Sequence, residues 1–330
     1  MMSSYLIKRF VSLFAVLLAM SLIVFCLQSL IPADPARAIA GPSAPVETVE
    51  AVRKELGLND PLVVQYGRFL GQLLHGDLGT SVRTRQPVAS DIAKYLPASL
   101  ELACMAMIMG TAMALLLALL QNTTRGAGVL RMIMLAAGST PIFLSALLLV
   151  YFVWFKLDLL PGSGRLSLRR FSGPTGFNVL DGLLVGKPEV SLDALQHLIL
   201  PALALALPVA VAVGRSLNSS LHDVLKQTYI RTVRGKGLGE ADIVVRHGLR
   251  NAASAPLAMI GLQIGLLFGN LLIVERVFSW PGLGLYVVQA FAVSDLPAVL
   301  GVSMVFGTFY ILINMVIEIL QSVADPRIRL

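Results

Sequence analysis

Charge is scarce in this sequence. Only 14% of its 330 residues are charged, whereas 56% are hydrophobic, and the mean hydropathy is +0.78. A soluble domain usually carries about 25% charged residues. So little charge, combined with long apolar runs, excludes an ordinary soluble protein and indicates an integral membrane protein.

Cysteine is scarce as well. Cys26 and Cys104 are the only two, and their spacing matches neither a metal site nor a disulfide framework. Both lie in apolar runs, so we expect them to be core residues. The sequence therefore predicts no metal centre.

Catalytic and nucleotide-binding motifs are absent. The nearest trace of a phosphate loop is Gly186-Lys187, but the first glycine of that motif is missing and Pro188 follows. Neither a nucleophile elbow nor a zinc-binding His-Glu-x-x-His helix occurs. We therefore expect a protein that is not an enzyme, binds no cofactor itself and takes its energy from outside the chain.

Six apolar runs are long enough to cross the roughly 30 Å hydrocarbon core of a membrane. They cover residues 11–31, 98–121, 132–155, 196–217, 253–275 and 297–322. The first run exceeds the 7–15 residues of a typical signal peptide, so we expect it to be retained. The predicted fold class is an all-α membrane protein with six transmembrane helices.

Ionisable residues inside these runs lie near the predicted ends. They are Glu101, His197, Arg215, Glu275 and Glu318. Transporters driven by protons or ions usually place such groups at membrane depth. Their distribution argues against a proton relay, a voltage sensor or a pore lined by charged rings.

The net charge of +7 comes from basic loops that fall on one side of a six-span model. These basic residues are Lys8, Arg9, Arg125, Arg131, Lys226, Arg231, Arg234, Lys236, Arg246, Arg250, Arg327 and Arg329. The positive-inside rule places that side, with both termini, in the cytoplasm. Membrane topology thus accounts for the positive charge, and no nucleic-acid partner is expected.

Two longer segments, 32–97 and 156–195, then face the outside. The first holds seven basic and seven acidic residues, a balance that suits translocated sequence. Within it, 46–57 has the pattern of a short helix, and Asn59-Asp60-Pro61 predicts its end.

Glycine and proline mark particular spans. Gly261, Gly265 and Gly269 recur every four residues, which favours close helix packing or a subunit seam if the spacing is more than chance. Pro141 interrupts the third run, and residues 201 and 208 are prolines in the fourth. These prolines predict bends or local unwinding, either as static kinks or around a cavity.

The stretch 239–250, GEADIVVRHGLR, predicts a short amphipathic helix. Gly239 is an acceptable N-cap, and acids in the first turn with bases in the last suit the helix dipole. Four residues fall close to one apolar face: Ala241, Val244, Val245 and Leu249. The helix is either an anchor on anionic lipid or an element whose apolar face fits a groove on a soluble, ATP-hydrolysing partner.

This stretch resembles the cytoplasmic EAA loop of ABC importer permeases of the dipeptide, oligopeptide and nickel uptake group. The matching positions in the loop are Tyr229, Arg231, Arg234, Lys236, Gly237, Leu238, Glu240, Arg246, His247, Arg250 and Asn251. Further similar motifs are Ile31-Pro32, Asp34-Pro35, Glu55-Leu56-Gly57-Leu58, His75-Gly76-Asp77-Leu78-Gly79, Phe278-Ser279-Trp280-Pro281-Gly282-Leu283-Gly284 and Asp325-Pro326-Arg327-Ile328-Arg329. The resemblance covers nearly the whole chain.

The resemblance implies a type I importer permease in the bacterial inner membrane. Its domains would be residues 1–31, the first helix with its tail; 32–97, a periplasmic segment; and 98–330, a five-helix core with the cytoplasmic loop 218–252. Two ATP-binding subunits, which carry the ATP and magnesium, would hold that loop through a coupling helix. A second homologous permease, membrane lipid and a periplasmic solute-binding protein complete the implied partners, and His75, Asp77, Trp280 and Pro281 are candidate periplasmic contacts.

The implied substrate is a di- or oligopeptide. Importers of nickel chelates, glutathione and opines share these motifs, so the sequence leaves them as alternatives. A self-sufficient secondary transporter would need ionisable groups at depth. A membrane-embedded scaffold or enzyme is the remaining alternative, and no catalytic constellation supports it.

Overall fold

The computed structural model describes residues 2–30, 35–41, 44–55, 57–123, 128–167 and 171–324. These residues form helices and connecting turns, with one isolated antiparallel bridge between Thr80 and Pro87. The chain divides into a larger unit, residues 1–5, 97–285 and 310–330, and a smaller unit, residues 6–96 and 286–309. The motifs at Ile31-Pro32, Asp34 and 325–329, like Arg125, lie outside the described residues.

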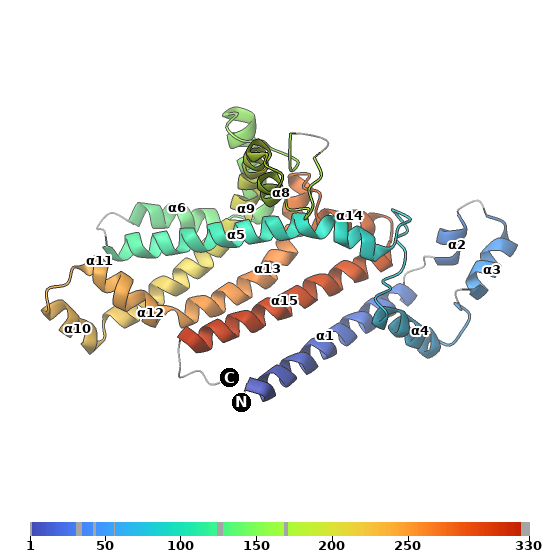
Figure 1. Ribbon diagram of the computed structural model, residues 1–330, viewed down its shortest axis with the longest axis horizontal. Coiled ribbons are helices and arrows are strands. Elements are labelled where there is room, and N and C mark those ends of the chain that lie inside the picture. The colour runs from blue at the N-terminus through green and yellow to red at the C-terminus, as the bar shows by residue number, and fades with distance from the viewer. Residues whose placement is uncertain are drawn as a thin grey trace. The chain divides into compact units, whose positions relative to one another are not determined.

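The larger unit is built around α9, Pro188–Leu225, as Figure 1 shows. Helices α6, α7, α8 and α13 all contact α9. The bounds in this unit are α5 Val88–Thr123 (from Pro97 onward), α6 Gly128–Ser139, α7 Ile142–Leu149, η1 Val150–Lys156, α8 Asn178–Leu184, α10 Thr228–Gly235, α11 Glu240–Asp242, η2 Ile243–Gly248, α12 Leu249–Ala252, α13 Ser254–Val277 and the second half of α15 Leu296–Ala324. Ala114 of α5 packs with Val209 and Val213 of α9 in a buried cluster.

The smaller unit contains α1 Met2–Leu30 from Leu6 onward, with the short helices α2 Pro35–Ala40, α3 Val46–Glu55 and α4 Leu62–Leu74. Helix α3 confirms the helix predicted at 46–57. Tyr66 of α4 contacts Phe25 of α1, with ring centroids 5.2 Å apart, and shares a 3.0 Å hydrogen bond with Ser21. Aromatic packing therefore holds α4 against α1.

Buried aspartates organise the rest of the smaller unit. Asp295, 0% exposed, accepts hydrogen bonds from the Ser81 hydroxyl at 2.5 Å and the Arg83 backbone N–H at 3.1 Å. Asp91, at the start of α5, accepts from the Tyr286 hydroxyl of α14, Leu283–Ala292, at 3.0 Å. The turn that contains the bridge is thus tied to the loop before α15.

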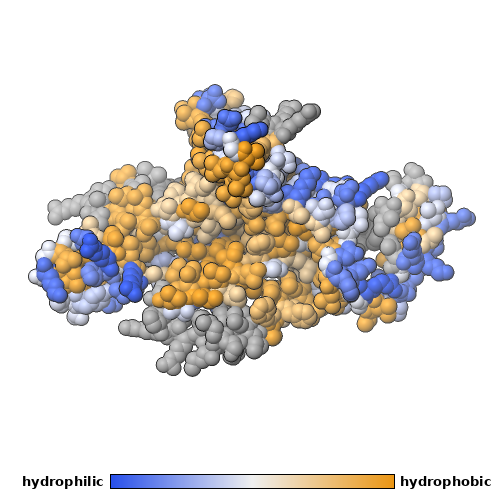
Figure 2. All heavy atoms as spheres, in the orientation of Figure 1, coloured by the Kyte–Doolittle hydropathy of each residue, from blue (hydrophilic) through white to orange (hydrophobic). Residues whose placement is uncertain are grey.

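Among the residues that the structure describes, four helices are long and apolar enough to cross a membrane. They include the stretches Val88–Gln121, Pro188–Leu225, Ser254–Val277 and Leu296–Val323, which contain the second, fourth, fifth and sixth predicted runs. The first and third runs correspond to shorter apolar stretches, Phe10–Ile23 and Ile142–Lys156. Figure 2 shows hydrophobic side chains over much of the visible surface. A six-span count stays a prediction.

The predicted proline breaks have different outcomes. Pro141 separates α6 from α7, as expected, because it begins a new helix as the N-cap residue. Helix α9, in contrast, continues through Pro201 and Pro208, so local unwinding was wrong there, and a bend at these prolines stays a prediction. Each proline removes one backbone donor, and the neighbouring residues Leu200 and Leu205 are buried.

The cysteine prediction was also wrong. Cys26 and Cys104 are both exposed on this chain. In a helix surrounded by lipid, an apolar residue needs no protein core around it, because hydrocarbon tails are as apolar as a protein interior. The rule that puts cysteine inside soluble proteins therefore does not transfer to these positions.

Two of the three glycines at four-residue spacing bring α13 close to the second half of α15. A Cβ added at Gly265 would lie 2.8 Å from Cε2 of Tyr310, and one at Gly261 would lie 2.7 Å from Oδ1 of Asn314. A Cβ at Gly269 would meet nothing within 4 Å. The close approach thus involves Gly261 and Gly265, and Gly269 faces away from it.

We predict that Gly265→Leu destabilises the isolated chain by about 2 kcal/mol, because the new side chain must displace the Tyr310 ring. Gly269→Leu is the matched control, with an expected change of less than about 1 kcal/mol. Thermal unfolding of both variants in detergent measures the difference. Equal melting temperatures for the two would contradict the assigned seam.

Candidate functional site

Residues 226–252, here called the basic segment, link α9 to α13 at one end of the larger unit (Figure 1). The segment folds as α10, a turn, and then the continuous run α11, η2 and α12. Gly237 in the turn has φ +81°, a left-handed conformation that favours glycine. Gly239 is the N-cap of α11, with φ −67° and ψ 151°, which confirms the predicted start of the helix.

Apolar residues attach the basic segment to the rest of the larger unit. Ile230, Ile243 and Val244 are each 0% exposed. Val244 belongs to a buried cluster with Leu221 of α9. A Cβ at Gly248 would lie only 3.1 Å from Cδ2 of that leucine. The segment is therefore packed against α9 and does not form a free surface loop.

The predicted apolar face needs correction. Val244 and Leu249 face the core, but Ala241 and Val245 are exposed, and the buried neighbour is Ile243. The cause is the π-helical turn of η2, because its i→i+5 hydrogen bonds shift the register that a 3.6-residue period predicts. This face is buried against the chain's own helices, so it is not open to a groove on another protein.

Exposed charges bracket the Gly237 turn. Arg234 donates from Nε and Nη2 to the two Glu240 oxygens at 2.6 and 3.0 Å. These hydrogen bonds lower the pKa of Glu240 and raise that of Arg234. Arg246 lies 3.3 Å from Asp242. Exposed pairs add little stability. The Arg234–Glu240 pair joins the two sides of the turn, whereas Asp242 and Arg246 are one helical turn apart on the same side.

Most of the predicted loop residues are exposed in the structure. The exposed ones are Tyr229, Arg231, Arg234, Lys236, Gly237, Glu240, Arg246, Arg250 and Asn251, while Leu238 and His247 are half-buried. Asn251 donates to the Tyr229 hydroxyl at 3.1 Å and to the His247 carbonyl at 2.8 Å. Sequence reasoning did not predict the burial of Ile230, which belongs to the similar run 229–232, or of Ile243, although a branched apolar residue inside a polar stretch was an available signal.

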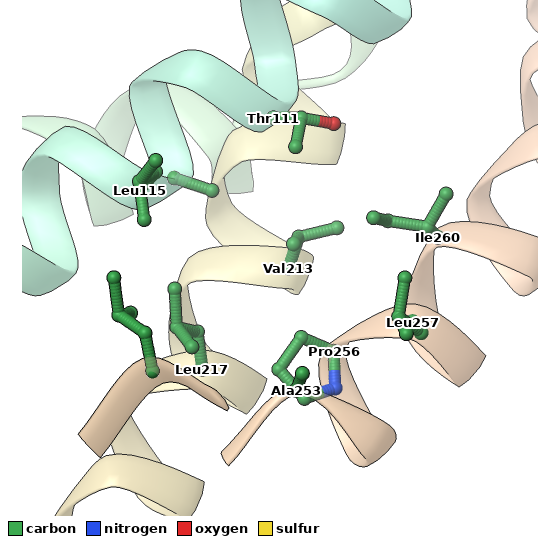
Figure 3. A pocket seen from close by; sticks show the side chains of 10 residues that line it. Thr111, Leu115, Val213, Leu217, Ala253, Pro256, Leu257 and Ile260 are labelled. Carbon is green, nitrogen blue, oxygen red and sulfur yellow. The ribbon is translucent and has the colours of Figure 1, made fainter. Parts of the chain in front are cut away.

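An apolar cavity of about 220 Å³ lies where the basic segment enters α13 (Figure 3). Leu249, Ala253, Pro256 and Leu257 line one side, and α5 and α9 contribute residues that include Leu115 and Leu217. Thr111 is the one lining residue with a polar side chain.

The four predicted outer contacts fall in different environments. His75 and Asp77 are exposed at the end of α4, where Asp77 accepts a 2.8 Å hydrogen bond from the Gly79 N–H. Pro281 is exposed, whereas Trp280 is 1% exposed. Of the last pair, only Pro281 offers a surface to a partner.

We predict that Leu221→Ala loosens the basic segment without unfolding the chain. Removing this side chain from the buried cluster costs about 2–4 kcal/mol, and the loss falls on the contacts between α9 and η2. Hydrogen exchange of residues 240–252 should accelerate, with little change at α8. Val245→Ala, an exposed position, is the control; equal protection in both variants would show that the cluster does not anchor the segment.

Comparison with known proteins agrees with this architecture. Residues 106–330 match the model of the family described as binding-protein-dependent transport system inner membrane component, and residues 2–103 match its N-terminal counterpart. The probable D,D-dipeptide transport system permease protein DdpB of Escherichia coli K12 is 39% identical over 98% of this chain and 97% of that protein. The dipeptide transport system permease protein DppB of Alkalihalophilus pseudofirmus is 37% identical over 99% of this chain and 100% of that protein.

Two further matches bear on the group and the fold. The glutathione transport system permease protein GsiC of Salmonella typhimurium is 37% identical over 99% of each chain. A solved structure of the MetNI methionine ABC transporter, in an inward-facing conformation, matches with a TM-score of 0.50 at 14% identity, over 70% of this chain and 96% of that one. The likeness to MetNI shows the fold alone. The family models and the near full-length relatives together show that the chain belongs to the family of binding-protein-dependent transport system inner membrane components, the permease subunits of ABC importers.

Proposed function

We propose that this chain forms half of the translocation pathway of an ATP-driven peptide importer and receives the force of ATP hydrolysis at the basic segment. One observation carries the proposal: the apolar side of the segment is buried on α9, and its charged side is exposed. A partner that binds the charged side and moves the basic segment would move α9 and α13 together with that segment. The ATPase, with its ATP and magnesium, resides on separate subunits.

The same proposal orients the chain. The basic segment and both termini face the cytoplasm, in accordance with the positive-inside rule. Residues 32–97 and the turn after α13 then face the outside, where His75, Asp77 and Pro281 are candidate contacts for a solute-binding protein. A second homologous permease completes the pathway, and two ATP-binding subunits contact the two basic segments.

A peptide is the proposed substrate. Among the relatives named above, two are described as dipeptide or D,D-dipeptide permeases and one as a glutathione permease. Glutathione is itself a small peptide, so peptide-like chemistry is common to all three descriptions. Nickel chelates and opines remain the alternatives that the sequence motifs leave open.

We predict that Gly237→Pro separates ATP hydrolysis from transport. Proline fixes φ near −65°, whereas this position has φ +81°, so the turn between α10 and α11 must change. Uptake should fall by about tenfold or more while membrane insertion is kept. Normal uptake would show that the turn geometry does not matter for coupling.

The charged surface has its own test. Arg246 and Arg250 are exposed, so replacing both with glutamate should leave the fold intact and repel an acidic partner surface. We expect uptake to be lost, because the ATPase subunits either no longer bind the permease or hydrolyse ATP without driving transport. Ala241→Ser, also at an exposed site, is the control that should retain uptake.

The experiment that tests the whole proposal is purification of the tagged chain in a gentle detergent, followed by mass spectrometry and an ATPase assay. Recovery of a second permease and ATP-binding subunits, with vanadate-sensitive hydrolysis, is the expected result. Solute-binding proteins can then be screened for stimulation of that hydrolysis in proteoliposomes. A chain that is recovered alone, stable and without ATPase activity would contradict the proposal.

A further inference from the structure

In the turn after α13, residues 278–282, buried and exposed residues alternate, and the buried ones fix the turn to the larger unit. Phe278 and Trp280 are each 1% exposed, whereas Ser279 and Pro281 are exposed. Ser279 has φ +50°, a conformation that residues other than glycine rarely adopt. A strained backbone conformation persists only where surrounding contacts stabilise it. The contacts of the buried residues in this turn therefore hold Ser279 in place.

The carboxyl group of Glu275 is the centre of those contacts. Its side chain is 0% exposed, and it accepts hydrogen bonds from the Ser99 hydroxyl at 2.6 Å and the Leu285 N–H at 2.9 Å. The Ser99 oxygen in turn accepts from the Leu283 N–H at 2.7 Å. Together the two side chains satisfy backbone donors in the first turn of α14, which have no partner within the helix.

The turn fits closely around this carboxyl group. A Cβ at Gly282 would lie 2.3 Å from Oε1 of Glu275, and one at Gly284 would lie 3.0 Å from Oε2. Side chains at these positions would collide with the carboxyl group. The two glycines therefore permit the backbone to approach the carboxyl group closely enough to hydrogen-bond with it. Burial of a carboxyl group without such hydrogen bonds would cost free energy.

Trp280 ties the same turn to α5. Its indole N–H donates to the carbonyl of Ala98 at 3.0 Å, one residue after the proline inside α5. The Arg165 guanidinium lies 5.4 Å from the centre of the Trp280 ring and forms an ion pair with Glu101 of α5. The turn is thus held by α5, by α13 and by the loop before α8.

Helix α13 joins this turn to the basic segment. It runs without interruption for 24 residues, about 36 Å at 1.5 Å per residue, from the end of α12 to the 278–282 turn (Figure 1). At its start, Ala253 has helical angles, φ −71° and ψ −27°, so no loop separates α12 from α13. Because no flexible joint interrupts this path, a displacement of the 278–282 turn is transmitted through α13 to the basic segment.

We propose that Glu275 is a positioning residue that locks the 278–282 turn to α13 and α5, so that docking of a solute-binding protein on Ser279 and Pro281 is transmitted along α13 to the basic segment. This inference rests on the proposed function, and it assigns the transmission to one buried side chain. Glu275 contacts neither substrate nor ATPase. It acts by keeping the exposed turn and the helix below it in one rigid piece.

The test uses the complex reconstituted in proteoliposomes, with the binding protein that stimulates wild-type hydrolysis. Glu275→Gln replaces one acceptor oxygen with a donor, and Ser99→Ala removes the hydroxyl that bridges the carboxyl group and the Leu283 N–H. In both variants we expect basal ATPase activity within about twofold of wild type. The half-saturating concentration of ligand-loaded binding protein should rise by about tenfold, as loss of a buried hydrogen bond at the docking turn implies.

Two further variants separate transmission from packing. Ser99→Thr keeps the hydroxyl and should restore stimulation, whereas a volume effect would not be rescued. Ser145→Ala removes a buried serine from α7 and should behave as wild type. Stimulation curves for Glu275→Gln and Ser99→Ala that coincide with wild type would overturn the inference, as would equal losses of basal and stimulated activity. Absence of stimulation in the wild-type complex would instead refute the proposed function.

Discussion

The burial of Val244 against Leu221 and its neighbours on α9 is the contact on which the rest of the functional architecture depends. Without it, the basic segment would be a charged loop whose movement reached no membrane helix. With it, the segment becomes an extension of the helix core, because α12 continues directly into α13. The charged residues can then face outward while the apolar ones carry the mechanical connection. Dispersion and the hydrophobic effect supply the attachment, and electrostatics is left to recognition.

The two ends of α13 are built in different ways. At the end nearest the basic segment, the packing is apolar and leaves a cavity of about 220 Å³. At the other end, Glu275, Ser99 and Trp280 form directional hydrogen bonds around close-fitting glycines. Apolar contacts tolerate sliding, whereas a fully bonded polar cluster permits only one arrangement. The packing of the helix is thus apolar and non-directional at one end, and polar and directional at the other.

Much of this fold was predictable from hydrophobic run length alone. The second, fourth, fifth and sixth runs all lie in long apolar helices, and Pro141 marks a true break. The start of the helix at Gly239 followed from local signals. The buried face of that helix could not be predicted from local signals, because a π-helical turn departs from the 3.6-residue period that the prediction assumed.

Other features needed long-range contacts that no local pattern encodes. Glu275 was recognised only as an acid near the end of a span, since its partners Ser99 and Leu285 are 176 and 10 residues away. Cys26 and Cys104 were misassigned because rules from soluble cores were applied to a surface that lipid covers. Trp280 was identified as part of a motif, but its burial depends on a carbonyl of α5.

The separation of the two faces of the basic segment also bears on how such transporters diverge. The residues that attach the segment, Ile230, Ile243 and Val244, are enclosed by the chain itself, so they answer only to its own packing. The exposed residues around Arg234, Arg246 and Arg250 make no contribution to that core. Under the proposed function, surface substitutions alone would therefore change which ATPase subunit a gene duplicate binds, at almost no cost in folding. Under that proposal, related importers in one membrane would each bind only their own ATPase subunits.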